Sequence, residues 1–230
     1  MNELWQGLVK ALELIITLDG EVIQIAGRSL TFAAISCSMA TLIFLPLGSI
    51  IHFNRFYGKR VLINIIQTLY SVPTVAIGLF VFVFISNAGP FGNLALLFTP
   101  AAIVLGQVLL VSPVITGLTI SALSGVDKAV IETAISLGAN RFQATVLVVR
   151  EARFAILAAL IMGFGRAISE VGLSLMVGGN IRGFTRTITT AISLETSKGD
   201  LELSIALGII LICLALVINI VLNRVQHRKE

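Results

Sequence analysis

The chain has 230 residues, of which 57% are hydrophobic and only 12% are charged, and its mean hydropathy is +1.00. A soluble domain carries about a quarter charged residues, so this composition excludes an ordinary soluble enzyme and favours a protein embedded in lipid. The net charge of +4 comes from short clusters between apolar runs, which do not form a nucleic-acid-binding face. Cys37 and Cys213 lie within apolar runs and lack metal-ligand spacing. We therefore expect contact with membrane lipid and no metal, cofactor or nucleic acid.

Long apolar segments predict an all-α, polytopic membrane protein that forms a single domain over residues 1–230. A membrane-spanning helix needs about 20 apolar residues. The stretch 61–126 carries no charge and is too long for one helix, and the turn-forming residues 87–93 divide it. The sequence predicts about five spans, at residues 29–51, 61–86, 100–123, 154–177 and 203–223.

Residues 4–18 form a different kind of segment. Leucine and isoleucine recur there at helical spacing, and Lys10 and Glu13 lie on the opposite face. Because the segment is short and carries charge, we expect an amphipathic helix at the membrane surface. A sixth span is the alternative.

Basic residues predict the orientation of the chain. They cluster after the first and the last predicted span, and such loops are usually cytoplasmic. Five spans then place the N-terminus outside and the C-terminus in the cytoplasm, with segment 124–153 also inside. The loop 179–201 carries basic residues although it should lie outside, so its cations need another explanation. The clusters that set the orientation are Arg55, Lys59 and Arg60 after the first span, and Arg224, Arg228 and Lys229 after the last.

The segment between the third and fourth spans, about residues 124–151, has the signals of two short helices. Asp127 can cap a helix start, Gly138 can end that helix with a positive φ, and a second helix can begin near Asn140. Two rigid helices on the cytoplasmic side could transmit force from a soluble partner. An amphipathic surface loop is the alternative on these grounds.

In the same segment, Glu132-Thr133-Ala134 is followed after three residues by Gly138. This pattern resembles the EAA motif of ABC importer permeases, with Thr133 replacing the usual alanine. Arg150-Glu151 stands where that family usually has Leu-Pro, which leaves open how the fourth span begins. The resemblance implies that this segment docks on an ATPase subunit. The coupling residues that it implies are Glu132, Thr133, Ala134, Gly138, Ala139 and Arg141.

Further motifs resemble the molybdate and sulfate permeases within that family. They are Val72-Pro73, the Gly-Arg-Ala-Ile-Ser-Glu-Val-Gly run at 165–172 and the Gly-Asn-Ile-Arg-Gly run at 179–183. Residues 150–153 and 194–200 are most similar to the tungstate-type branch. The resemblance implies that two copies of the chain assemble with two ATPase subunits and an extracytoplasmic oxyanion-binding protein.

The expected function is thus passage of an oxyanion, tungstate first and molybdate or sulfate as alternatives, into the cytoplasm across the plasma membrane. No G-x-x-x-x-G-K-[ST] loop occurs in the sequence, so we assign ATP hydrolysis to the separate subunit and none to this chain. An ATP-independent channel or carrier and a non-transporting scaffold are the rival classes.

Four charged residues are candidates for the transport pathway or its gate. Arg166 and Glu170 are four residues apart and are expected to share one helical face inside the fourth span, where they either pair structurally or line the path. Arg182 and Arg186 lie in the glycine-rich outer loop. They either form an anion vestibule or pair with Glu195, Asp200 or Glu202.

Overall fold

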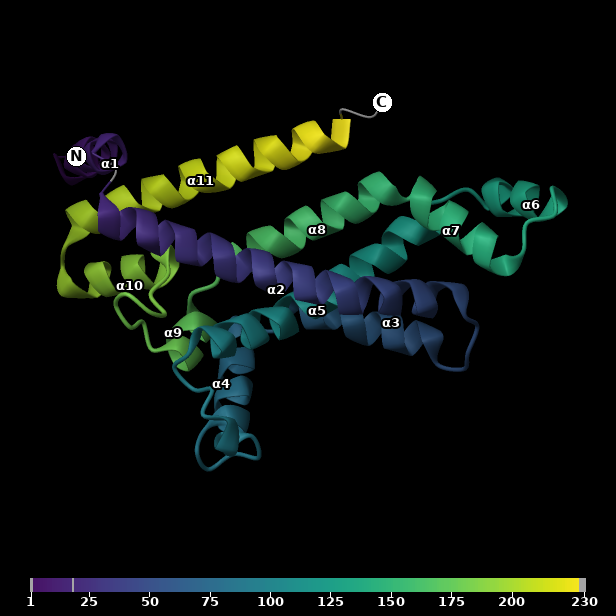
Figure 1. Ribbon diagram of the computed structural model, residues 1–230, viewed down its shortest axis with the longest axis horizontal. Coiled ribbons are helices and arrows are strands. Elements are labelled where there is room, and N and C mark those ends of the chain that lie inside the picture. The colour runs from purple at the N-terminus through teal and green to yellow at the C-terminus, as the bar shows by residue number, and fades with distance from the viewer. Residues whose placement is uncertain (1, 18, 228–230) are drawn as a thin grey trace.

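The computed structural model describes residues 2–17 and 19–227, and within these ranges it contains helices and no strand. The predicted all-α class is confirmed. Long helices run side by side along the longest axis of the molecule, with α6 and α7 at one end and α10 at the other (Figure 1). The helices that extend between these ends include α2 (Gly20–Phe53), α5 (Pro100–Ser124), α8 (Arg153–Ile168) and α11 (Leu201–His227).

Three helices, α2, α5 and α11, are long and apolar enough to cross a membrane, and the number rises to five if each of two bent helix pairs counts as one span. The first, third and fifth predicted spans are therefore confirmed as continuous helices. Helix α2 begins earlier than predicted because the Asp19 carboxylate accepts hydrogen bonds from the N–H groups of Glu21 and Val22, each at 3.0 Å. Such an N-cap stabilises a helix start.

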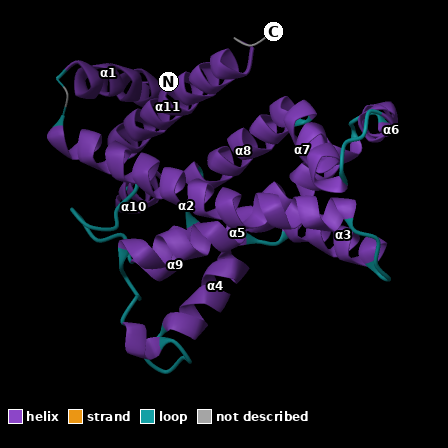
Figure 2. Cartoon of the chain, turned by 45° about the vertical axis from the view of Figure 1, so that its right-hand side comes forward, coloured by secondary structure: helices purple, strands orange, loops and turns teal. Residues whose placement is uncertain are grey.

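The prediction of one continuous helix over 61–86 is wrong. The segment divides into α3 (Lys59–Thr68), a 3₁₀ turn at Leu69–Ser71 and α4 (Thr74–Ile85), and the two halves meet at 99°. Pro73 stands at the break. Proline has no N–H to donate and favours an extended conformation for the preceding residue, here Val72, so the helix cannot continue through this point. As a result α4 runs at a steep angle to the long helices, which Figures 1 and 2 show from two directions, and it packs against α5 and the short helix α9 (Gly172–Gly178).

The fourth predicted span is also broken. Helix α8 ends at Ile168, a short helix α9 (Gly172–Gly178) follows, and the two are bent by 58°. The expected common helical face of Arg166 and Glu170 is therefore wrong, since Glu170 lies beyond the end of α8. At the other end of α8, a single residue, Ala152, separates it from the preceding helix. The helix is thus interrupted at this point, although the proline that is usual here in the family with the EAA motif is absent.

The core lies around α5, which packs against α2, α8 and α9. Its side chains Ile103, Val111 and Ile115 are fully buried. Helix α2 comes close to α5 at Gly48, where an added Cβ would lie 2.9 Å from the carbonyl oxygen of Thr116. A glycine at this point allows the two backbones to pack in direct contact.

Helix α1 (Asn2–Ile16) packs against α11. The contact is close at Gly7, where an added Cβ would lie 2.4 Å from Cγ2 of Ile205. A helix of 15 residues rises about 22 Å, less than the roughly 30 Å of a bilayer core. It is not among the helices long enough to span. This agrees with the predicted amphipathic helix and not with a sixth span. Apolar side chains of α1 that remain exposed include Leu4, Trp5, Leu8 and Leu12.

Candidate functional site

Two short helices, α6 (Lys128–Ser136) and α7 (Arg141–Glu151), form the predicted pair at one end of the molecule (Figure 1). Asp127 caps α6 by accepting a hydrogen bond from the Ala129 N–H at 3.0 Å. Asn140 and Gln143 cap α7 reciprocally. The Gln143 N–H donates to Oδ1 of Asn140 and the Asn140 N–H donates to Oε1 of Gln143, each at 2.8 Å. Between the helices Gly138 adopts φ +88°. The turn is therefore fixed by local chemistry that the sequence already contains.

The exposed side chains of this pair differ in part from those predicted. Glu132, Thr133 and Arg141 are exposed, whereas Ala134 is buried and packs the pair together. The most exposed large apolar side chains are Leu137, at 83%, and Phe142, at 75%. Sequence reasoning missed both residues. The available signal was a leucine and a phenylalanine next to the capping residues of a polar turn, where neither is needed for a helix start or end.

Arg141 also borders a hollow of about 240 Å³ between the two helices and the end of α2. The hollow is lined by Phe53, Ile131, Ile135, Ala144 and Thr145 as well. The end of α2 at Phe53 thus lies directly beside the helix pair.

Glu170 lies in the break between α8 and α9, and only 5% of it is exposed. Its Oε1 accepts a hydrogen bond of 2.7 Å from the N–H of Leu173, in the first turn of α9. Its backbone carbonyl accepts a hydrogen bond of 2.7 Å from the Thr189 hydroxyl, at the start of α10 (Ile188–Lys198). Glu170 therefore links the break to α10, the helix that follows α9.

Gln107 of α5 stabilises the other side of the same break. Its Nε2 donates to the carbonyl oxygen of Ala167 at 3.1 Å, and its Oε1 accepts from the Ser36 hydroxyl at 2.8 Å. Gln107 is buried, so these bonds pair polar atoms that would otherwise be costly in an apolar core. The helix end at Ala167 is thus tied to both α5 and α2.

Arg166 does not pair with Glu170 in the part of the chain that the structure describes, and its Nε is buried without a hydrogen-bond partner there. The expected pairing is therefore wrong, for the reason already given: the helix ends between the two residues. Arg166 remains a cation in the last turn of α8, at the point where the span bends.

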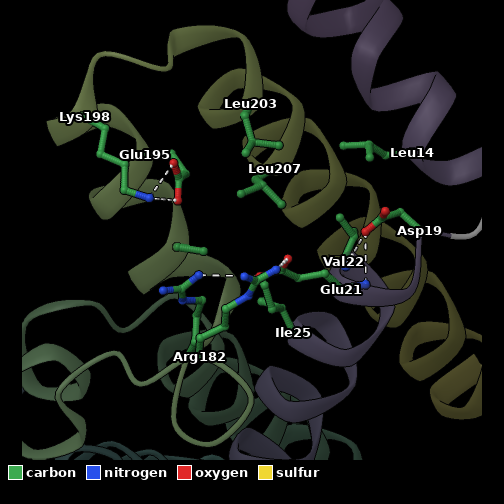
Figure 3. A pocket seen from close by; sticks show the side chains of 12 residues that line it. Leu14, Asp19, Glu21, Val22, Ile25, Arg182, Glu195, Lys198, Leu203 and Leu207 are labelled. Carbon is green, nitrogen blue, oxygen red and sulfur yellow. Dashed lines mark hydrogen bonds and ion pairs between the residues drawn. The ribbon is translucent and has the colours of Figure 1, made fainter.

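The loop between α9 and α10 lies at the end of the molecule opposite the helix pair (Figure 1). It carries Arg182 and Arg186, which share the carboxylate of Glu21. Arg182 donates to it through both Nε, at 2.9 Å from Oε1, and Nη2 (Figure 3). Nη1 of Arg186 lies 3.5 Å from Oε1. The hydrogen bonds to Glu21 raise the pKa of the Arg182 guanidinium, and the attraction between the two charges adds to this.

The expected alternative, in which these arginines pair with Glu195, Asp200 or Glu202, is wrong. Glu195 instead pairs with Lys198 on its own helix, with Nζ 2.8 Å from Oε1. Glu21 is at the start of α2, far from the loop in sequence, and no local pattern indicated the contact. A cavity of about 340 Å³ lies beside the cluster (Figure 3). Its lining includes Glu21, Arg182, Arg186, Glu195 and Lys198.

These features define the class of protein. Up to five apolar spans, two of them broken, combine with a capped pair of surface helices at one end and a charged cluster at the other. This is the architecture of a multi-pass membrane protein.

Comparison with known proteins gives the family. Residues 44–230 match the family described as "Binding-protein-dependent transport system inner membrane component". The chain belongs to this family, and it is a permease-type subunit embedded in the membrane.

Two curated relatives match over most of their length. A probable anion ABC transporter permease protein of Haloferax volcanii is 40% identical over 212 residues, which cover 90% of this chain and 91% of the relative. The tungstate uptake system permease protein TupB of Peptoclostridium acidaminophilum is 36% identical, covering 99% of this chain and 100% of the relative. Among solved structures, a bacterial ABC transporter involved in the import of alginate has a TM-score of 0.75 at 19% identity, covering 94% of this chain and 83% of that one. This last likeness supports the fold alone.

Proposed function

We propose that this chain is the permease through which an ATP-driven importer passes a tetrahedral oxyanion, most specifically tungstate, into the cytoplasm. The observation that carries the proposal is the 36% identity to a tungstate uptake permease over 99% of the chain. The probable anion permease at 40% identity supports the same substrate class. Molybdate and sulfate are the alternatives within that class. An ATP-independent channel or a scaffold would leave the capped α6–α7 pair without a role.

The α6–α7 pair is the proposed docking element for the ATPase subunit. Leu137 and Phe142 present apolar surface at its tip, and the neighbouring Glu132, Thr133 and Arg141 add polar groups. An apolar anchor with a polar rim is the usual composition of a protein interface. With two copies of the permease, two ATPase subunits would dock, one on each pair. Gly138 and Ala139 shape the turn between the helices.

A second copy of the chain is the proposed partner of α4. This helix projects from the body after the bend at Pro73 (Figures 1 and 2). Phe80 is 65% exposed, and Val75, Leu79 and Val83 are each more than half exposed. Apolar surface that already faces lipid supplies no hydrophobic driving force for association. The second copy is proposed because five spans are few for enclosing a pathway.

The proposed orientation places the α6–α7 pair and the C-terminus in the cytoplasm and the Arg182 loop outside, facing an extracytoplasmic oxyanion-binding protein. Of the basic residues after the last span, Arg224 is described and Arg228 and Lys229 lie outside the described residues. A reporter that works only in the cytoplasm should be active when fused to the C-terminus. Activity of a periplasm-only reporter at that position would contradict this orientation.

The pathway in this proposal passes the Arg182–Arg186 cluster and the break in the fourth span, where Arg166 provides a cation and Glu170 holds the bend. Transport should be tested in proteoliposomes that contain the permease–ATPase complex and the binding protein. Labelled tungstate should enter with ATP, and excess unlabelled tungstate should compete better than molybdate or sulfate. Preferential competition by sulfate would assign the chain to that oxyanion instead.

A further inference from the structure

Glu21 lies between two cations that could otherwise bind a free anion. Its carboxylate accepts two hydrogen bonds from Arg182 and lies 3.5 Å from Nη1 of Arg186 (Figure 3). A carboxylate held in this way by two guanidinium groups occupies the place that an oxyanion would take, since arginine binds both kinds of anion with the same planar fork.

The loop that carries the arginines is held by its own hydrogen bonds. The Thr185 hydroxyl donates to the carbonyl oxygen of Gly178 at 2.6 Å and accepts from the Ile181 N–H at 2.9 Å. The Arg186 N–H donates to the carbonyl oxygen of Ile181 at 3.0 Å. Gly183 has φ +77°, which completes the turn. These bonds hold the backbone of the loop without Glu21, so both arginines keep their places in the loop when Glu21 is replaced.

The cluster has more hydrogen-bond donors than Glu21 can satisfy. The side chain of Arg186 is only 14% exposed, yet its Nε is buried without a partner in the described part of the chain. A guanidinium has five N–H donors. The adjacent cavity of about 340 Å³ is large enough to hold one tetraoxoanion beside the two arginines. A tetrahedral oxyanion has four acceptor oxygens, whereas the carboxylate has two.

We propose that Arg182 and Arg186 form a binding site for a doubly charged tetrahedral oxyanion and that Glu21 is its built-in competitor. The carboxylate pairs with the arginines when no oxyanion is present, and an arriving oxyanion displaces it. Because each bound oxyanion must replace an existing ion pair, the site holds its ligand weakly and releases it readily, as a transit site requires. This inference rests on the proposed oxyanion transport and identifies the residues that adjust the affinity.

The test is Glu21→Gln in the purified permease–ATPase complex without the binding protein. Tungstate binding, measured by equilibrium dialysis at low ionic strength, should become about tenfold tighter or more, because the competing charge is lost. Glu21→Asp keeps a carboxylate and should bind as weakly as the wild type. Glu21→Gln combined with Arg182→Gln should lose the gain. The matched control is Glu13→Gln, which removes an exposed carboxylate paired only with Lys10 in the described structure.

The outcomes separate this inference from the proposed function. Wild-type uptake of tungstate together with unchanged binding in Glu21→Gln would overturn the inference, because Glu21 would then be a structural link only. A gain in Glu13→Gln of the same size would also overturn it, since any lost negative charge would suffice. Failure of the wild-type complex to take up tungstate, molybdate or sulfate would instead overturn the proposed function.

Discussion

Replacing Gly138 by valine should abolish the stimulation of ATP hydrolysis by the loaded binding protein, while the chain still inserts into the membrane. Gly138 has φ +88°, and a β-branched residue there costs about 1–3 kcal/mol or distorts the turn. No atom outside the turn lies within 4 Å of an added Cβ, so the effect comes from the backbone and not from a clash. The angle between α6 and α7 would change, and both exposed apolar side chains at the tip would move.

Two controls isolate this cause. Gly138→Asn should keep most of the stimulation, because asparagine tolerates the left-handed conformation. Gly125→Ala changes a glycine near the start of the same segment, where φ is −79°, and should behave as the wild type. ATP hydrolysis should be measured with and without loaded binding protein in each variant. Full stimulation in Gly138→Val would show that the α6–α7 turn does not couple the two subunits.

Glu170→Ala should reduce ATP-driven uptake by an order of magnitude or more. The N–H of Leu173 would lose its acceptor in a buried site, which costs about 1–3 kcal/mol, and the bend between α8 and α9 would lose its tie. Glu170→Gln keeps an oxygen acceptor in the same place. Uptake by this variant should therefore stay close to the wild-type value, with the amount of assembled complex measured in parallel.

The comparison between these variants distinguishes a cap from a charged gate. If Glu170→Gln lost uptake as completely as Glu170→Ala, then the charge and not the hydrogen bond would be what matters. Ser169→Ala is the matched control, since the Ser169 hydroxyl is exposed and bonds only to the carbonyl oxygen of Arg166 at 3.2 Å. Its uptake should not change.

Local chemistry explains which parts of the fold could be predicted from the sequence. Asp127, Gly138 and Asn140 each act on backbone groups within a few residues, so their positions in the sequence were enough to predict the α6–α7 pair. Hydropathy predicted the apolar segments because it too is a property of neighbouring residues. It could not predict the breaks, because an apolar segment has the same hydropathy whether its helix is straight or bent.

The three prolines in the apolar segments illustrate this limit. Pro46 and Pro113 lie inside α2 and α5, which continue past them, whereas Pro73 ends a helix and turns the chain by 99°. All three are prolines in apolar segments, so the residue type and its hydropathy do not separate the two outcomes. The fourth span breaks without any proline, and its ends are held by Gln107 and Thr189 from other helices.

The charged sites depended even more on distant contacts. Arg182 and Arg186 were recognised from their unusual place in a predicted outer loop, but their partner, Glu21, is 161 residues from Arg182. Arg166 and Glu170 looked like a pair because both were assumed to lie on one helix. Their separation follows from the end of α8 at Ile168, which the sequence alone did not indicate.

The central claim, that this permease imports an oxyanion by coupling to an ATPase, is tested most directly in proteoliposomes. The complex should be reconstituted with tungstate-loaded binding protein on the side of the Arg182 loop and ATP on the side of the α6–α7 pair. We expect tungstate to accumulate against its gradient only when ATP, the binding protein and this chain are all present. Accumulation without ATP, or hydrolysis of ATP with no entry of tungstate, molybdate or sulfate, would contradict the account.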